Sequence, residues 1–210
     1  MENRFLDLHQ IVQLVEMPNK NAIIDAYVQN ADRIAITPGA RKKHQAWKGG
    51  YLDHVVYATN FGIRLHNLNL KLGFQPDHNE GDIALVMLLH DFGKIARYKK
   101  VENGWDYVEN PDQAEHDFFD KTIKSHNFQL TNIQKNALEF IHGEGSKYTP
   151  KGRLMLPLAT LCHQADVWNA RYCPDNPLPN GKDSWRGAYR HSEKIGLVKY
   201  IRALSQFRIS

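Results

Sequence analysis

The stretch Asp82-Ile-Ala-Leu-Val-Met-Leu-Leu-His90-Asp91-Phe-Gly-Lys94 decides the fold of this chain. Its uninterrupted apolar run predicts an element buried on all sides, and periodicity alone would allow either a helix or a strand. Alanine, leucine and methionine favour the helix. The run ends in His90-Asp91, and a buried carboxylate is costly unless it is paired or binds a metal. Gly93 predicts a helix end here, where two neighbouring side chains could turn toward one point.

Two more polar residues interrupt apolar helical segments elsewhere. Asp166 lies within residues 154–170, which are apolar almost all round, and His54 lies within residues 51–65. Each residue alone is explained as well by a hydrogen-bonded polar side chain in the core, because buried polar groups usually find partners. The combined order of His, then His-Asp, then Asp predicts a single site built by three helices.

The sequence around these positions resembles the HD-domain superfamily of metal-dependent phosphohydrolases. His44-Gln-Ala-Trp-Lys-Gly-Gly-Tyr-Leu-Asp-His54 is similar to the H-x-x-x-x-G-G-L-L-E-H motif of the bacterial 3′-to-5′ exoribonuclease-like branch. Leu88-Leu-His-Asp-Phe-Gly-Lys94 resembles the family's L-L-H-D-I-G-K, and Leu161–Ala170 resembles L-H-x-x-D-x-x-D-A with Asn169 in place of the last acid. The resemblance covers residues 44–170 and has no counterpart for either end of the chain.

The resemblance implies a site for one or two divalent ions. The first ion would be held by His54, His90, Asp91 and Asp166. The second would add His116 and His142, with Asp91 as the bridge. Nitrogen and carboxylate ligands suit Mn, Fe, Co, Ni, Mg or Zn, and such ions activate water and neutralise charge on a phosphoryl group.

Two residues of the central stretch are the expected catalytic residues. Asp91 would hold the metal, and Lys94 would meet a substrate phosphate as a point charge. An ordinary lysine at a helix C-terminus is the alternative for Lys94, because the helix dipole favours cations there.

Four other residues are candidates for substrate binding. His44 and Lys48 precede the double glycine, in a stretch that also reads as a solvated loop. Trp185 and Arg186 lie in the basic end of the chain, since Arg171–Ser210 has eight Lys and Arg against three Asp and Glu, while the remainder is nearly balanced. A phosphate-bearing ligand and a solvated basic surface explain this surplus equally well.

The fold expected is all-α, an HD-domain helical bundle with a small β-hairpin near residues 96–108. One domain should span residues 1–210, with N-terminal helices over 1–40, a motif core over 44–170 and a basic C-terminal extension over 171–210. Further helices are expected near residues 51–72, 112–126, 131–142, 154–171 and 193–205. The N-terminus lacks the features of a signal peptide and no segment is long and apolar enough to cross a membrane. Two cysteines form no disulfide framework, and we expect a cytoplasmic protein.

The function expected is hydrolysis of a phosphate ester in a nucleotide or short oligonucleotide. A long nucleic acid is disfavoured, because no oligonucleotide-binding fold is recognisable beside the motif core. One alternative is a mixed-valent di-iron oxygenase, which some HD proteins build from the same six ligands. Another is a nucleotide-binding regulator without turnover. The sequence does not predict the oligomeric state.

Overall fold

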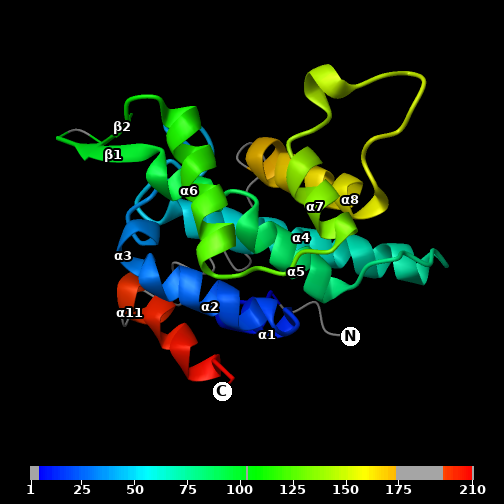
Figure 1. Cartoon of the computed structure of the whole chain (residues 1–210), viewed down its shortest axis with the longest axis horizontal. Coiled ribbons are helices and arrows are strands. Elements are labelled where there is room, and N and C mark those ends of the chain that lie inside the picture. Colours follow the sequence, from blue (N-terminus) through cyan, green and yellow to red (C-terminus); the bar gives the residue numbers. More distant parts are fainter. Residues whose placement is uncertain (1–4, 103, 174–195, 210) are drawn as a thin grey trace.

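The computed structural model describes residues 5–102, 104–173 and 196–209, and these are predominantly helical (Figure 1). The expected all-α class with one small hairpin is confirmed. The α-helices are α1 (Leu8–Leu14), α2 (Asn19–Gln29), α3 (Ala31–Ile34), α4 (Gly50–Lys71), α5 (Glu80–Leu89), α6 (Pro111–Ser125), α7 (Asn132–Phe140), α8 (Pro157–Val167) and α11 (Leu197–Arg202). Shorter helical segments are the 3-10 helices η1 (Phe92–Ala96), η2 (Gly145–Lys147) and η5 (Ala203–Phe207) and the π-helix η3 (Trp168–Tyr172).

Helix α5 is the predicted buried helix, and it lies between two hydrophobic cores. Leu85 and Leu88 belong to the core shared with α1, α2, α3 and α11, whereas Val86 and Met87 belong to the core shared with α7 and α8. Opposite faces of the helix are therefore both buried, which explains why its sequence shows no polar stripe. An Asn79–Asp82 capping box begins the helix.

Helix α4 crosses α5 and α8 at a point where all three helices are close. A Cβ atom on Gly62 would lie 3.1 Å from Ile83 of α5 and 3.5 Å from Ala165 and Leu161 of α8. The absence of a side chain at this position thus lets three helices meet. Figure 1 shows α4 and α5 running through the middle of the molecule, with α7 and α8 above them and α1, α2 and α11 below.

The end of the chain packs on its beginning. Helix α11 contacts α2 and α3, and η5 contacts α2. Arg202 forms an ion pair with Asp32 at 2.6 Å, and Arg208 forms one with Asp25 at 3.1 Å. Arg202 and Arg208, which belong to the C-terminal basic surplus, therefore face acidic partners on the N-terminal helices.

The hairpin consists of β1 (Tyr98–Val101) and β2 (Gly104–Tyr107), which pair antiparallel within the predicted range. Gly73, at φ 92°, follows α4 as expected of a left-handed cap. Helix α5 ends at Leu89, close to the end that Gly93 predicted, but Gly93 is not a left-handed cap because it lies within η1. A Cβ there would lie 2.6 Å from the Glu115 backbone oxygen, so Gly93 lets η1 pack on α6.

The structure also bears on the expectations about disulfides and membrane-spanning segments. Both cysteines, Cys162 and Cys173, are buried free thiols. No helix in the described part of the chain combines the length and apolar character that crossing a membrane requires.

Candidate metal centre

Three helices bring four polar side chains together at the middle of the bundle. His54 lies in the second turn of α4, His90 and Asp91 follow the last residue of α5, and Asp166 lies near the end of α8. His90 has helical backbone angles, but Asp91 has φ −108° and ψ 9°. The chain thus leaves the helix between these two residues, and their side chains can face one point, as the sequence predicted.

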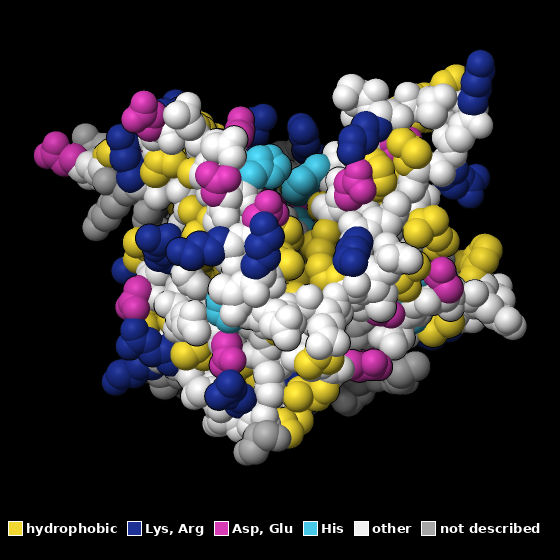
Figure 2. All heavy atoms as spheres, in the orientation of Figure 1, with side chains coloured by type: hydrophobic (Ala, Val, Ile, Leu, Met, Phe, Trp, Pro, Cys, Tyr) yellow, Lys and Arg dark blue, Asp and Glu magenta, His cyan; other side chains and the backbone are white. Residues whose placement is uncertain are grey.

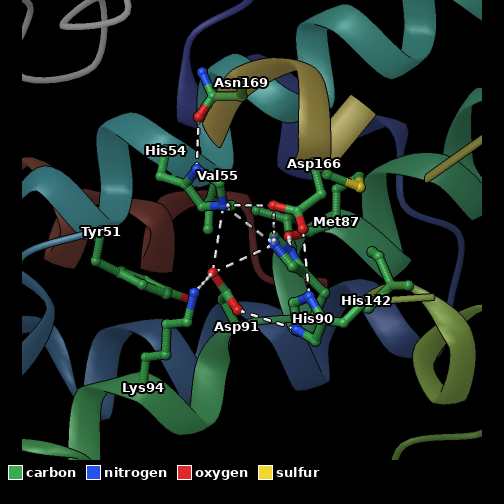
Figure 3. Close-up of polar contacts among 12 residues, drawn as sticks. Tyr51, His54, Val55, Met87, His90, Asp91, Lys94, His142, Asp166 and Asn169 are labelled. Atoms are coloured by element: carbon green, nitrogen blue, oxygen red, sulfur yellow. Dashed lines mark hydrogen bonds and ion pairs between the residues drawn. The ribbon is translucent and has the colours of Figure 1, made fainter. Parts of the chain in front are cut away.

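The distances within this cluster match the spacing of ligands around one metal ion (Figure 3). His54 Nε2 lies 3.1 Å from Asp166 Oδ1, 3.3 Å from Asp91 Oδ2 and 3.4 Å from His90 Nε2. His90 Nε2 lies 3.4 Å from Asp91 Oδ2 and 3.7 Å from Asp166 Oδ1. Atoms bound to one ion at about 2.0–2.2 Å would lie about 2.8–3.6 Å apart as neighbours in tetrahedral or octahedral geometry. The ligand atoms of His54, His90 and Asp91 all lie within 4.8 Å of one another, so these three side chains could hold a metal ion. Asp166 lies beside the two imidazoles of this group.

Hydrogen bonds on the far side of each imidazole turn its second nitrogen toward this point. His54 Nδ1 donates to Asn169 Oδ1 at 2.5 Å, and His90 Nδ1 donates to the Met87 carbonyl at 2.7 Å. Both acceptors are oxygens without a proton, so each Nδ1 carries the hydrogen in the neutral ring. The Nε2 lone pairs then face the cluster, which is the tautomer a metal requires.

Burial and charge have opposite effects on the protonation of these groups. Burial lowers the pKa of His54, but the Asp166 and Asp91 carboxylates outweigh it and raise the pKa to about 9. Burial also raises the pKa values of Asp91 and Asp166, yet the neighbouring cationic groups lower both well below the usual range. Without a metal, the carboxylates are thus stabilised by a proton on His54 and by Lys94.

The Lys94 side chain lies beside the cluster rather than at the solvent-facing end of a helix. Its Nζ lies 2.5 Å from Asp91 Oδ2, and only 17% of the side chain is exposed. Burial lowers the pKa of Lys94, but the Asp91 charge raises it more, so the lysine stays protonated. The explanation as an exposed helix-capping lysine is therefore wrong, and the cluster contains a fixed positive charge.

The two extra histidines that the resemblance implies occupy different environments. His142 Nε2 lies 3.5 Å from Asp91 Oδ1 and its Nδ1 lies 3.3 Å from Asp166 Oδ2, while 55% of the side chain remains exposed. His116, on α6, is exposed, and it takes part in none of the contacts that join the cluster among the described residues. Figure 2 shows histidine side chains gathered in a hollow between α6 and α7.

Of the four predicted substrate-binding residues, the structure places His44 next to the candidate metal centre. The His44 ring lies 5.1 Å from that of His54, and burial lowers its pKa to about 4. Lys48 is exposed. Trp185 and Arg186 lie outside the described residues. Glycine is required at both positions after Lys48: Gly49 has φ 79°, and a Cβ on Gly50 would lie 1.9 Å from the Gln45 carbonyl oxygen.

Sequence reasoning missed the role of two buried amides. Asn169 stood out only as a departure from an acidic motif position, and Gln45 did not stand out at all. In the structure both side chains are fully buried, and the Gln45 Nε2 donates to Asn169 Oδ1 at 3.0 Å, beside the bond from His54. An amide next to a motif histidine was the available signal for Gln45.

The protonation of His54 predicts a pH-dependent affinity for metal. A metal must displace the Nε2 proton, so below pH 9 the affinity for Co²⁺ should rise about tenfold per pH unit, consistent with release of one proton. The proton on His54 also stabilises the metal-free fold. Because the folded pKa lies above the unfolded value, this contribution is complete below about pH 6.5 and is lost as the pH rises through about 9. Titration with Co²⁺ between pH 6.5 and 8.5, with thermal unfolding at each pH, measures both effects. An affinity independent of pH would contradict this protonation scheme.

No family model, no curated protein and no solved structure matches the chain in comparisons of its sequence and fold with known proteins.

Proposed function

We propose that this protein is a metal-dependent phosphohydrolase of the HD type that cleaves a phosphate ester in a nucleotide or short oligonucleotide. The observation that carries the proposal is the convergence of His54, His90, Asp91 and Asp166 with both imidazole Nδ1 protons turned outward. The same four residues, in the same order, carry the sequence resemblance. Mn, Fe, Co, Ni, Mg and Zn all suit these donors.

The charges of the cluster favour a divalent ion and an anionic substrate. Two carboxylates balance one divalent charge, and Lys94 adds a positive charge against Asp91. A bound ion would activate a water molecule and neutralise charge on the phosphoryl group. Lys94 would bind a phosphoryl oxygen, because its ammonium group is a compact positive charge with hydrogen-bond donors.

The residues at the open side of the cluster would orient the substrate. His142 is half exposed while touching both carboxylates, so it lies where a substrate would arrive. His44 is neutral at pH 7 and lies on the other side of His54. A second ion would need His142 and His116 to turn toward Asp91. The exposure of His116 makes one ion the simpler proposal.

Substrate size and cellular location belong to the same proposal. The described residues bring one lysine to the cluster, whereas a nuclease that tracks a long strand needs a groove with several basic and aromatic side chains. We therefore propose that mononucleotides and dinucleotides are better substrates than long RNA or DNA. The free thiols of Cys162 and Cys173 are consistent with a cytoplasmic location, where disulfides rarely persist.

A phosphate-release screen tests this function. Purified protein is stripped of metal, reloaded with Mn, Mg, Zn, Ni, Co or Fe, and offered mononucleotides, dinucleotides and a 20-nucleotide RNA. We expect hydrolysis that depends on the added metal and is fastest with the small substrates. Product from the 20-nucleotide RNA alone would contradict the proposed substrate size.

The same screen under argon separates hydrolysis from oxygenation. Hydrolysis needs neither iron nor oxygen, so turnover with the redox-inert Mg or Zn should be unchanged without air. Turnover that requires both iron and oxygen would instead identify the di-iron oxygenase chemistry. Binding of nucleotides without product under every metal would favour the regulatory alternative.

A further inference from the structure

A loop before α4 is built around one buried amide. Gln45 is fully buried and has φ 44°, in the left-handed region that non-glycine residues rarely adopt. Its carbonyl accepts hydrogen bonds from the backbone N–H groups of Gly39 at 2.9 Å and Trp47 at 2.8 Å. Gly39 also lacks room for a side chain, since a Cβ would lie 2.9 Å from Gln45 Cβ. The loop therefore holds the Gln45 side chain in one place, at the cost of an unfavourable backbone conformation.

This amide joins a buried chain of contacts that ends at a metal ligand. Gln45 Nε2 donates to Asn169 Oδ1 at 3.0 Å, and the same oxygen accepts from His54 Nδ1 at 2.5 Å. The remaining atoms of the two amides, Gln45 Oε1 and Asn169 Nδ2, are buried and have no hydrogen bond within the usual geometric limits to any residue that the structure describes. Such atoms disfavour folding. Among the described residues, the hydrogen bonds of the two amides thus converge on the Asn169 oxygen that accepts from His54.

We propose that Gln45 and Asn169 are positioning residues that hold His54 in the tautomer whose Nε2 is free for a divalent ion. An oxygen of Asn169 can only accept, so it places the ring proton on Nδ1. Turning Asn169 alone would set its NH₂ group against the NH₂ group of Gln45, donor against donor. Gln45 therefore keeps the Asn169 oxygen toward His54. The inference rests on the metal site of the proposed function but not on the reaction catalysed there.

The amide of Asn169 can either accept or donate a hydrogen bond, whereas a carboxylate at this position could only accept one. If both amides turned together, Asn169 Nδ2 would donate to Gln45 and to His54, and the ring proton would move to Nε2, where it blocks a metal. An aspartate has no donor and would exclude this blocked form. The Asn169→Asp variant should therefore keep the metal-binding tautomer, whereas Asn169→Leu should not.

Metal affinity and NMR of His54 test the proposal together. We expect the Asn169→Leu and Gln45→Leu variants to bind Co²⁺ about 10–100-fold more weakly, as is typical of lost partners of metal-ligating histidines. Asn169→Asp should bind at least as tightly as the wild type. Asn19→Leu is the matched control, because it removes a buried amide that bonds the Gln129 backbone away from the site. It should lower the melting temperature and leave Co²⁺ affinity unchanged.

The NMR measurement uses the metal-free protein at pH 10, where the His54 ring is neutral and carries one proton. It therefore remains decisive even if the wild type binds no metal. The Nδ1–H proton of His54, assigned by its loss in His54→Gln, should appear far downfield in the wild type and in Asn169→Asp. It should disappear or move upfield in Asn169→Leu. An unchanged resonance in Asn169→Leu, or wild-type Co²⁺ affinity in that variant, would overturn the proposal. A wild-type protein that shows this resonance but binds no Co²⁺ would refute the proposed function alone.

Discussion

Replacement of Asp91 with alanine is expected to remove metal binding and to lower kcat/KM by at least about 1000-fold, or about 4 kcal/mol of transition-state stabilisation. Asp91 Oδ2 lies within 3.4 Å of the Nε2 atoms of both His54 and His90, and Asp91 Oδ1 lies 3.5 Å from His142 Nε2. It therefore contacts both buried imidazoles of the cluster as well as Lys94 and His142. Metal content by mass spectrometry and steady-state kinetics measure the two losses.

Two additional variants separate loss of the metal from loss of the fold. Asp91→Asn preserves the shape of the side chain and removes its charge, so it should fold and still lose most of the metal. Asp82→Asn is the matched control on α5, the helix that precedes Asp91, because Asp82 bonds Asn79 and Gln134 far from the cluster. It should unfold at a lower temperature and keep both metal and activity. Normal metal content in Asp91→Asn would contradict the ligand role of this residue.

The variant Lys94→Met is expected to reduce kcat by about 100–1000-fold, the usual loss when a charge that stabilises the transition state is removed. Lys94 is the one lysine in contact with the cluster among the described residues. Its removal leaves the carboxylates more negative, so divalent ions should bind at least as tightly as in the wild type. Kinetics at saturating metal, together with Co²⁺ titration, check this combination.

The kcat and the Co²⁺ affinity of Lys94→Met together show whether Lys94 contacts the substrate or only holds Asp91 in place. Lys147→Met is a control, because Lys147 pairs with Glu139 at an exposed site and should have no effect. If Lys94→Met lost metal in parallel with activity, the lysine would act only by holding Asp91 in place. If both metal and kcat were unchanged, its proposed contact with phosphate would be wrong.

The sequence predicted that His54, His90, Asp91 and Asp166 converge, because each of them breaks an apolar pattern. His90-Asp91 ends a helix buried on both faces, and a carboxylate at that position needs a strong partner. Asp166 and His54 break other apolar helices in the same way. The helical class and the hairpin followed from local propensity and turn residues, which do not depend on distant contacts.

The features that the sequence did not predict depend on contacts between distant segments. Gln45 and Asn169 are separated by 124 positions, and only the packing of the loop before α4 against the π-helix after α8 brings them together. Gly93 resembled a helix cap, but its role is the close approach of α6. His116 matched a motif position, yet its exposure is set by how α6 lies on η1.

The most direct test of the account is the position of bound metal in a crystal of the Mn²⁺-loaded protein. Anomalous scattering locates manganese without reference to the surrounding protein atoms. We predict one strong peak about 2.0–2.3 Å from His54 Nε2, His90 Nε2 and one oxygen each of Asp91 and Asp166, close to the distances of other first-row metals. A strong peak elsewhere, or no peak among these four side chains at saturating Mn²⁺, would contradict the central claim that they form a metal centre.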